Sequence, residues 1–215
     1  ARIAAEHEAA RLRREANPEP EPISARYGSR CPVCLEKWDV NERFVFQACC
    51  ARLVCESCEE RNGEAPCTLC RAPYPKSHAE MLAQTRRHVE NDVPEAITHL
   101  AHAYRTGDLG LPQNFKKTVK IYKRAIELGD GEAMTALGYM YQHGRGVKLD
   151  PKKAETLYRK GAARGHFASQ YNLGRLERDA GNIEEARRWY ALSAAQGLTD
   201  AKSALARLDA AAGDS

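Results

Sequence analysis

The stretch 133-AMTALGYMYQHGRGVKLDPKKAETLYRKGAARGH-166 predicts two helices that pack against each other. Leu137 and Gly138 lie in its first half and Tyr158 lies in its second half. A small residue lets two helices approach closely, while Leu and Tyr fill the space between the helix layers. The stretch therefore indicates one helix pair.

The ends of the second helix in this stretch are marked by residues with fixed backbone preferences. Asp150 followed by Pro151 provides an N-cap and a proline at the first helical position. Gly165 suits the left-handed residue that ends a helix. The second helix is thus expected to begin at Pro151 and to end before Gly165.

The same pattern recurs along the chain, which predicts stacked helix pairs. The aligned segments are 96-AITHLAHAY-104, 133-AMTALGYMY-141, 169-SQYNLGRLE-177 and, in part, 201-AKSALARL-208. The column of Leu and a small residue contains Leu100-Ala101, Leu137-Gly138, Leu173-Gly174 and Leu205-Ala206. The tyrosine column contains Tyr122, Tyr158 and Tyr190, each seven residues before a glycine (Gly129, Gly165 and Gly197) and four residues after Thr118, Ala154 or Ala186. One such pair cannot bury its apolar face alone, so the pairs must stack.

These residues resemble the Sel-one-like repeat, a relative of the tetratricopeptide repeat. The resemblance implies an α-solenoid over 93–212, whose groove binds a protein partner. The units are expected at 93–129, 130–165 and 166–197, with a capping helix at 199–212. The loop at 107-GDLGL-111 is one residue longer than the family pattern, and the loop at 180-AGN-182 is shorter. An unrelated alanine-rich bundle is the alternative.

The chain ahead of the repeats divides into three parts. Residues 1–30 are expected to be a charged helical or disordered tail with a Pro-Glu linker, and residues 31–71 hold all eight cysteines. Residues 72–92 are expected to be a connecting segment with a helix over 78–90, because Ser77 and Glu80 fit a capping box. We expect this helix to pack onto the first repeat and to fix the angle between the modules. The fold class is therefore mostly α, with a small zinc module of a β-hairpin and a helix before the solenoid.

The charge and hydropathy of the chain argue against some classes of partner and location. The chain has 215 residues and a formal net charge of +4, with interspersed charges rather than a basic stripe, so nucleic acid is an unlikely partner. No apolar run is long enough to span a membrane, and no secretory signal is visible, although the chain begins with Ala rather than Met. We expect an intracellular reducing compartment, either cytoplasm or nucleus, where clustered cysteines more often hold metal than form disulfides.

The cysteines form three C-x2-C pairs and one adjacent pair, a pattern typical of structural zinc sites. The pairs are Cys31/Cys34, Cys55/Cys58 and Cys67/Cys70, and the adjacent pair is Cys49-Cys50. A C-x2-C knuckle places two sulfurs at the separation that a tetrahedral zinc ion requires. Eight thiolates suffice for two structural zinc ions, whose binding would supply the folding energy of so small a module. Disulfides and a redox-active C-x-x-C are the alternatives.

The order of these cysteines resembles the RING finger in an all-cysteine form. The resemblance implies a cross-brace in which one zinc takes Cys31, Cys34, Cys55 and Cys58, and the other takes Cys49, Cys50, Cys67 and Cys70. No histidine lies between residues 30 and 75 to replace Cys49 or Cys50. The segments 43–47 and 52–54 are expected to be short hairpin strands, and a short helix is expected after Cys55.

The RING resemblance also implies contact with a ubiquitin-conjugating enzyme. Its contact residues would be Val33 between the first two ligands, Leu35 beside it, and Arg71 directly after Cys70. The chain would then be a ubiquitin ligase, or a component of one, whose repeats recruit a protein partner. The polar segment 59-EERNGEAP-66 and Thr68 depart from active ligases. The alternative is a scaffold without catalysis, in which the zinc module and the solenoid only join proteins.

An enzyme acting on small molecules has little support. The sequence contains no phosphate-binding glycine loop, no nucleophile elbow and no carboxylate pair, and no direct catalytic residue is identified. His99 and His102 lie three residues apart on an expected helix. A catalytic zinc ion needs three protein ligands, so packed or exposed histidines are the favoured interpretation.

Overall fold

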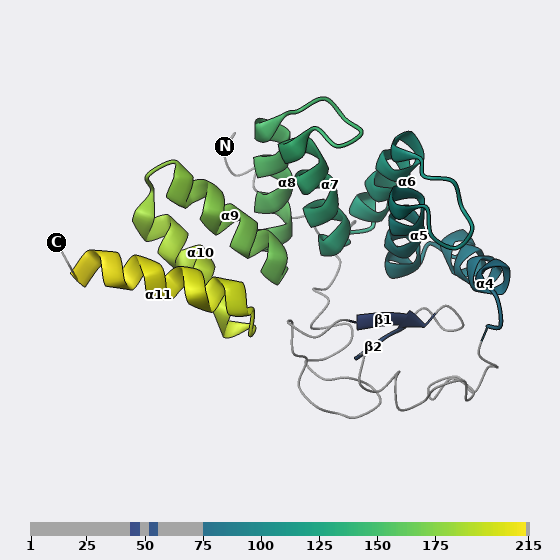
Figure 1. The fold of residues 1–215 in the computed structure, drawn as a ribbon, viewed down its shortest axis with the longest axis horizontal. Coiled ribbons are helices and arrows are strands. Elements are labelled where there is room, and N and C mark those ends of the chain that lie inside the picture. The colour runs from purple at the N-terminus through teal and green to yellow at the C-terminus, as the bar shows by residue number, and fades with distance from the viewer. Residues whose placement is uncertain (1–43, 48–51, 56–74, 214–215) are drawn as a thin grey trace, which may run out of the picture.

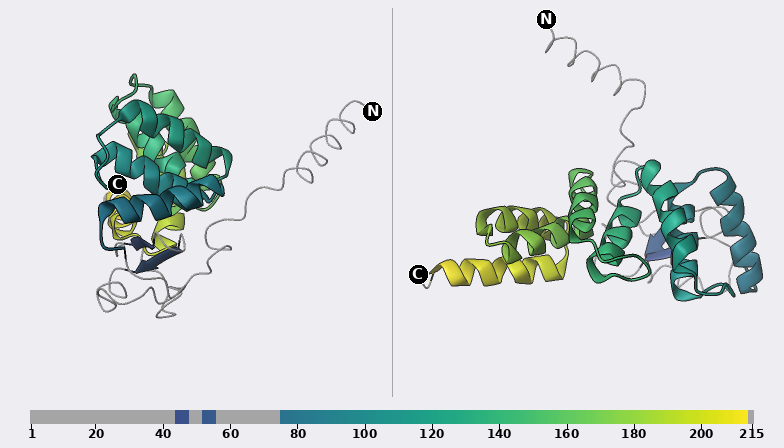
Figure 2. Two further views of the ribbon diagram at one scale, coloured as in Figure 1. Left: turned by 90° about the vertical axis from the view of Figure 1, so that its right-hand side faces the viewer. Right: turned by 90° about the horizontal axis from the view of Figure 1, so that it is seen from above.

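The structure is a computed structural model that describes residues 44–47, 52–55 and 75–213. Within these residues the fold is mostly helical and forms a tetratricopeptide-like solenoid (Figure 1). The helices are α4 (His78–Glu90), α5 (Pro94–Thr106), α6 (Phe115–Glu127), α7 (Gly131–His143), α8 (Pro151–Ala163), α9 (Phe167–Asp179), α10 (Ile183–Ala195) and α11 (Thr199–Gly213). They follow one another from α4 at one end of the solenoid to α11 at the other (Figure 2).

A two-stranded antiparallel sheet precedes the helices. Strand β1 (Phe44–Gln47) pairs with β2 (Arg52–Cys55), with Phe44 opposite Cys55 and Gln47 opposite Arg52. The predicted hairpin strands are therefore confirmed at the level of the backbone. The helix expected after Cys55 lies outside the described residues.

Helix α4 has the bounds that its capping residues predict. The Ser77 side chain accepts a hydrogen bond from the Glu80 backbone N–H at 3.2 Å. The Glu80 carboxylate accepts from the Lys76 backbone N–H at 2.7 Å, one residue earlier than in a regular capping box. The prediction of a helix over 78–90 is confirmed, with a shifted reciprocal bond.

Helix α4 packs on the first repeat, as the sequence predicts. Val89 contacts the apolar cluster that α5, α6 and α7 form. At the end of α4, the Arg124 guanidinium of α6 donates to the Val89 carbonyl at 2.8 Å and, just past the helix, to the Asp92 carboxylate at 2.6 Å. The orientation of the cysteine-rich module relative to the repeats lies outside the described residues.

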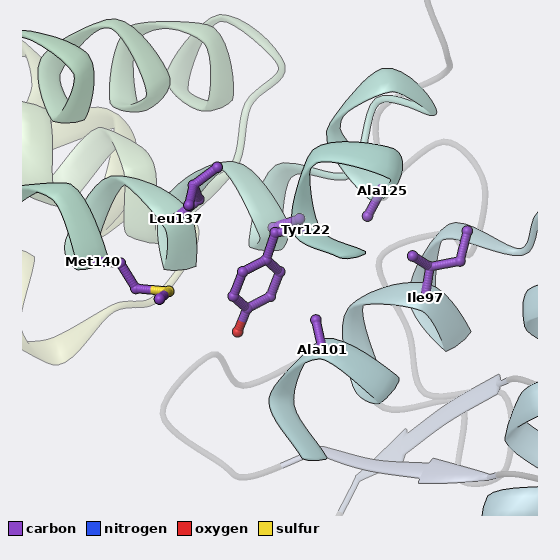
Figure 3. Close-up of a cluster of buried hydrophobic side chains, with 7 residues drawn as sticks. Ile97, Ala101, Tyr122, Ala125, Leu137 and Met140 are labelled. Carbon is purple, nitrogen blue, oxygen red and sulfur yellow. The ribbon is translucent and has the colours of Figure 1, made fainter. Parts of the chain in front are cut away.

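The tyrosine and small-residue columns meet inside each helix pair. Tyr122, Tyr158 and Tyr190 are fully buried. A Cβ atom placed on Gly138 would lie 2.7 Å from the Tyr158 ring, and one placed on Gly174 would lie 2.8 Å from the Tyr190 ring. Figure 3 shows the first tyrosine, Tyr122, between Ala101 of α5 and Leu137 and Met140 of α7. The same side chain therefore fills its own repeat and joins it to the next.

Glycines end the second helix of each pair in the left-handed conformation, as predicted. The φ angles are 87° at Gly129, 77° at Gly165 and 109° at Gly197. After α6, the Gly129 N–H donates to the Ile126 carbonyl and the Asp130 N–H donates to the Ala125 carbonyl. This is a Schellman motif, and it turns the chain into the next repeat within the three residues 128–130.

The loops within the pairs differ in length, which matches the sequence alignment. Eight residues (107–114) join α5 to α6, seven (144–150) join α7 to α8, and three (180–182) join α9 to α10. The last helix, α11, packs its buried Ala204 against Ala186 and Tyr190 of α10. None of the described helices is both long and apolar enough to cross a membrane.

Candidate functional site

The sequence-predicted zinc and RING residues lie almost wholly outside the described part of the chain. Cys55 has a described backbone, as the last residue of β2. The other predicted residues are outside it: Cys31, Cys34, Cys49, Cys50, Cys58, Cys67 and Cys70 among the ligands, and Val33, Leu35 and Arg71 among the contact residues. Their roles stay predictions from the sequence.

In the described residues, no group of three or more His, Cys, Asp or Glu side chains could hold a metal ion. His99 and His102 are on α5. Burial lowers the pKa of both imidazoles to about 4, with the neighbouring His102 adding to the effect on His99 and the Arg105 charge adding to the effect on His102. Both rings are therefore neutral at pH 7.

Polar side chains of α5, α7 and the start of α9 approach one another across the boundaries between repeats. His102 Nε2 on α5 lies 3.5 Å from Glu132 Oε1 on α7. On the next boundary, Thr135 Oγ1 on α7 lies 3.0 Å from His166 Nδ1 and 2.5 Å from Ser169 Oγ on α9. Hydrogen bonds thus connect the second repeat to the third, whereas at the first boundary the neutral His102 ring only lies close to Glu132.

The Thr135 hydroxyl is both a donor and an acceptor of hydrogen bonds at the boundary between the second and third repeats. It donates to the Gly131 carbonyl at 3.0 Å, so it accepts from its other partners. Ser169 is fully buried. A side chain at Gly161 of α8 would collide with Ser169, so the glycine leaves the space that this hydroxyl occupies.

Asp130 is a buried acid at the boundary between the first two repeats. Its side chain is 5% exposed and accepts a hydrogen bond from the Ala133 N–H at 2.6 Å. Burial, followed by the negative charges of Glu132 and Glu95, raises the pKa of Asp130 to about 7, although the hydrogen bond from Ala133 opposes the shift. This helix cap is thus partly protonated near neutral pH.

The end of α7 carries an exposed surface that we call the Tyr139 patch, made of Tyr139, His143, Arg145 and Leu149. The Tyr139 and His143 rings lie 4.0 Å apart, and the Arg145 guanidinium lies 5.2 Å from the Tyr139 ring centroid. Tyr139 is 38% exposed and Leu149 is 57% exposed. Leu149 lies next to Gly144, where a Cβ atom would be 3.4 Å from the leucine Cβ.

The loop that carries Arg145 and Leu149 is anchored at several points. The Arg145 N–H donates to the Met140 carbonyl at 3.0 Å, and the Asp150 N–H donates to the Tyr141 carbonyl at 2.9 Å. Gly146 has a φ of 72° and approaches Phe115 of α6 so closely that a side chain at this position would overlap the ring. The patch is therefore held in one arrangement by its own backbone.

Sequence reasoning identified the glycine-rich loop only as a family motif and did not identify the patch. Aligning the repeats column by column would have placed His102, Tyr139 and Arg175 at one position of the first helix. Tyr139 lies where the other two copies have His102 and Arg175, and such a difference indicates an exposed residue that does not serve the common packing. The burial of Asp130 leaves no comparable signal in the sequence.

The three helix pairs match a known family model. The Sel1 repeat model matches residues 94–130, 131–166 and 168–198. The mouse protein named Protein sel-1 homolog 2 is 32% identical over 80 residues, which are 37% of this chain and 12% of that protein. This chain therefore spans a small part of the length of that relative.

Two crystal structures have the same repeat fold. A Sel1 repeat protein from Oxalobacter formigenes is 30% identical, covers 57% of this chain and 51% of its own chain, and superposes with a TM-score of 0.53. The antigen c5321 of uropathogenic Escherichia coli, described as displaying an SLR fold, is 29% identical, covers 60% of this chain and 29% of its own chain, and has a TM-score of 0.54. Together with the packing described above, these matches show that residues 94–198 are three Sel1 repeats.

Proposed function

We propose that the chain is a protein-binding scaffold, in which the Sel1 repeats receive a protein partner and the cysteine-rich segment is a second, zinc-held unit. One observation carries this proposal. The stacked helix pairs leave aromatic, cationic and aliphatic side chains exposed together at the Tyr139 patch. Stacked helical repeats build extended surfaces of the kind that bind other proteins. The similarity of residues 94–198 to Sel1 repeats supports the same function.

Photo-crosslinking from two faces of the solenoid tests the scaffold. The photoreactive residue benzoylphenylalanine replaces Tyr139 on α7 in one full-length variant, and Lys120 on α6 in a matched variant. Both side chains are exposed. A protein identified from position 139 but not from position 120 is then purified and titrated against the unlabelled chain. The scaffold predicts saturable binding of that purified protein, whereas its failure to bind would count against the scaffold.

The eight cysteines fit two zinc ions as a donor set. Four thiolates around each ion make a closed tetrahedral site with no open position for a substrate. Zinc bound in this way would contribute folding energy. We propose the sequence-derived ligand sets, Cys31, Cys34, Cys55 and Cys58 for one ion and Cys49, Cys50, Cys67 and Cys70 for the other. Metal analysis of the purified chain should give two zinc ions, and Cys50→Ser should lower the content to one.

A second candidate function is ubiquitin ligase activity, which the order of the cysteines and Arg71 directly after Cys70 favour. Arg71 would contact the conjugating enzyme or ubiquitin, because its planar guanidinium donates several hydrogen bonds at once. Val33 and Leu35 would supply the apolar contact. Discharge of ubiquitin from charged conjugating enzymes tests this, with Arg71→Ala as the variant. Stimulation that Arg71→Ala abolishes would establish a ligase; no stimulation by zinc-loaded protein would leave the scaffold alone.

A further inference from the structure

We propose that the Tyr139 patch is a docking site for an acidic peptide segment that carries a large apolar residue on a partner protein. The inference rests on the proposed scaffold function and names the partner chemistry and the place of contact. Its starting point is that Tyr139 and Leu149 are two of the exposed large apolar side chains among the described residues. The two belong to adjacent parts of one short segment, the end of α7 and the loop that follows.

The charge around the patch sets the sign of the partner. Arg145, Lys148, Lys152 and Lys153 are all exposed in the loop and the first turn of α8. The single acid in this segment, Asp150, is engaged as the N-cap of α8 and lies 3.0 Å from the Lys153 ammonium. The segment from residue 144 to residue 153 therefore carries an excess of positive charge; within it Arg145 lies over the Tyr139 ring, while Lys153 lies over the neighbouring Tyr141 ring. A complementary partner segment carries carboxylates.

The geometry at Tyr139 favours a peptide with an apolar residue as well as charge. Arg145 lies over the Tyr139 ring and His143 lies beside it, so the ring has a fixed orientation with part of its surface exposed. The His143 Nδ1 atom lies 3.0 Å from the Tyr139 carbonyl, which can only accept, so this nitrogen carries the hydrogen. Rigid Tyr and Arg side chains are the types most often found at the energetic centre of protein interfaces.

The anchoring of the loop reduces the cost of binding. The Met140 and Tyr141 carbonyls hold the backbone of Arg145 and Asp150, and Gly146 lies against Phe115. A surface that is already ordered loses little conformational entropy when a partner docks. Lys120 on α6 is also exposed and positively charged, but it makes no cation–π contact in the described part of the chain, unlike Lys117 of the same helix, which lies over the Tyr104 ring. Lys120 therefore provides a matched control on the same molecule.

Fluorescence polarisation with the full-length chain tests this site. The probe is a fluorescein-labelled nonapeptide in which a Leu-Phe pair is flanked by Asp and Glu residues. Two reference probes replace either the acids by Lys or the Leu-Phe pair by Ser. We expect saturable binding of the first probe, weakened by high salt, and much weaker binding of both reference probes. Failure of the wild-type chain to bind the first probe, or equal binding of a reference probe, would overturn the proposal.

Surface variants locate the binding. Tyr139→Ala and Arg145→Glu should each weaken binding of the first probe at least about tenfold. Lys120→Glu, which makes the same charge change on α6, should alter it by less than about twofold. All three side chains are exposed, so we expect each variant to fold, and circular dichroism checks this. If Lys120→Glu weakened binding of the first probe as much as Arg145→Glu does, the probe would be responding to the overall charge only, and the proposed site would be wrong. The scaffold itself would survive if the photo-crosslinked partner still bound the chain in the same assay.

Discussion

The first and second repeats have the same backbone arrangement but differ in three details: the small residue that faces the buried tyrosine, the partner of the tyrosine hydroxyl, and the residue after the turn glycine. The buried tyrosine faces Ala101 in the first repeat and Gly138 in the second. The Tyr158 hydroxyl donates to Gln142 at 2.9 Å, whereas the Tyr122 hydroxyl is buried without a hydrogen bond to any described residue. Helix pairing therefore depends on the size of the buried residues, while their polar contacts vary between copies.

The turns after these repeats differ as well. Gly129 and Gly165 form equivalent left-handed turns. The next residue is Asp130 after the first repeat and His166 after the second. Asp130 caps the following helix through its side chain, but His166 makes no such cap and instead contacts Thr135 of the preceding helix pair. The backbone motif thus fixes the turn, and the side chain that follows it is free to take another role.

Replacing Gly138 by Ala is the change that separates the two repeats most strongly. The new Cβ atom would lie 2.7 Å from the Tyr158 ring, which is fully buried. Overpacking costs about 1–3 kcal/mol and the helix propensity of Ala returns about 1 kcal/mol, so we expect the free energy of unfolding to fall by up to about 2 kcal/mol. Urea denaturation measures it. The reverse change, Ala101→Gly, should cost about 1 kcal/mol, and a stabilised Gly138→Ala variant would show that the ring is not confined.

Removing the tyrosine hydroxyls tests the second difference. Tyr158→Phe loses the hydrogen bond to Gln142 and should lower the free energy of unfolding by about 1 kcal/mol. Tyr122→Phe should leave that free energy unchanged or raise it, because its hydroxyl is buried without a hydrogen-bond partner in the described part of the chain. The Arg105 guanidinium lies near enough to act on the pKa of Tyr122, so an equal loss in both variants would reveal a bond to Arg105. Paired urea titrations at one pH compare the two directly.

The two turn residues should give pH dependences of opposite sign. Burial raises the pKa of Asp130 from 3.8 to about 7, so the folded state holds a proton that the unfolded state releases between these values. The stability that Asp130 contributes is therefore present at low pH and is lost as the pH rises through this window. Asp130→Asn keeps a capping side chain and removes the titration. Relative to wild type, this variant should gain stability as the pH rises from 4 to 7, and urea titrations at several pH values measure the gain.

His166 provides the matched comparison. Burial lowers the pKa of this imidazole from 6.5 to about 4, so the unfolded state binds a proton that the folded state does not. Its effect is a stability that rises with pH between these two values. His166→Gln should therefore flatten the rise in thermal midpoint across that interval, while Asp130→Asn should steepen it. Parallel pH profiles from the two variants would contradict the assignment of the two buried environments.

Most of the helical fold could be predicted from the sequence, because its determinants are local and repeated. The Ser77 cap, the Asp150-Pro151 start and the glycines after each pair fixed the helix ends, and the spacing of Leu, Gly and Tyr fixed which faces pack. A pattern present in several copies carries its own check on each assignment. The shifted bond, in which the Lys76 N–H donates to the Glu80 carboxylate, was not predicted, because a one-residue change in a side-chain contact leaves no trace in the pattern.

The candidate surface was not predictable in the same way. The Tyr139 patch depends on Arg145 folding back over a ring six residues earlier, and on a loop held by backbone bonds to Met140 and Tyr141. The network of Thr135, His166 and Ser169 joins residues more than thirty positions apart. Such contacts depend on how successive repeats stack. The cysteine assignments remain predictions from spacing, since the residues that carry them lie outside the described part of the chain.

Isothermal titration calorimetry tests the scaffold most directly. The protein found by photo-crosslinking at position 139 is titrated into the 215-residue chain and into its Tyr139→Ala variant. We expect stoichiometric binding with a negative heat-capacity change, as burial of apolar surface requires, and a weaker complex with Tyr139→Ala. No heat of binding at any temperature would contradict the scaffold, and equal affinity for the two chains would contradict binding at the Tyr139 patch.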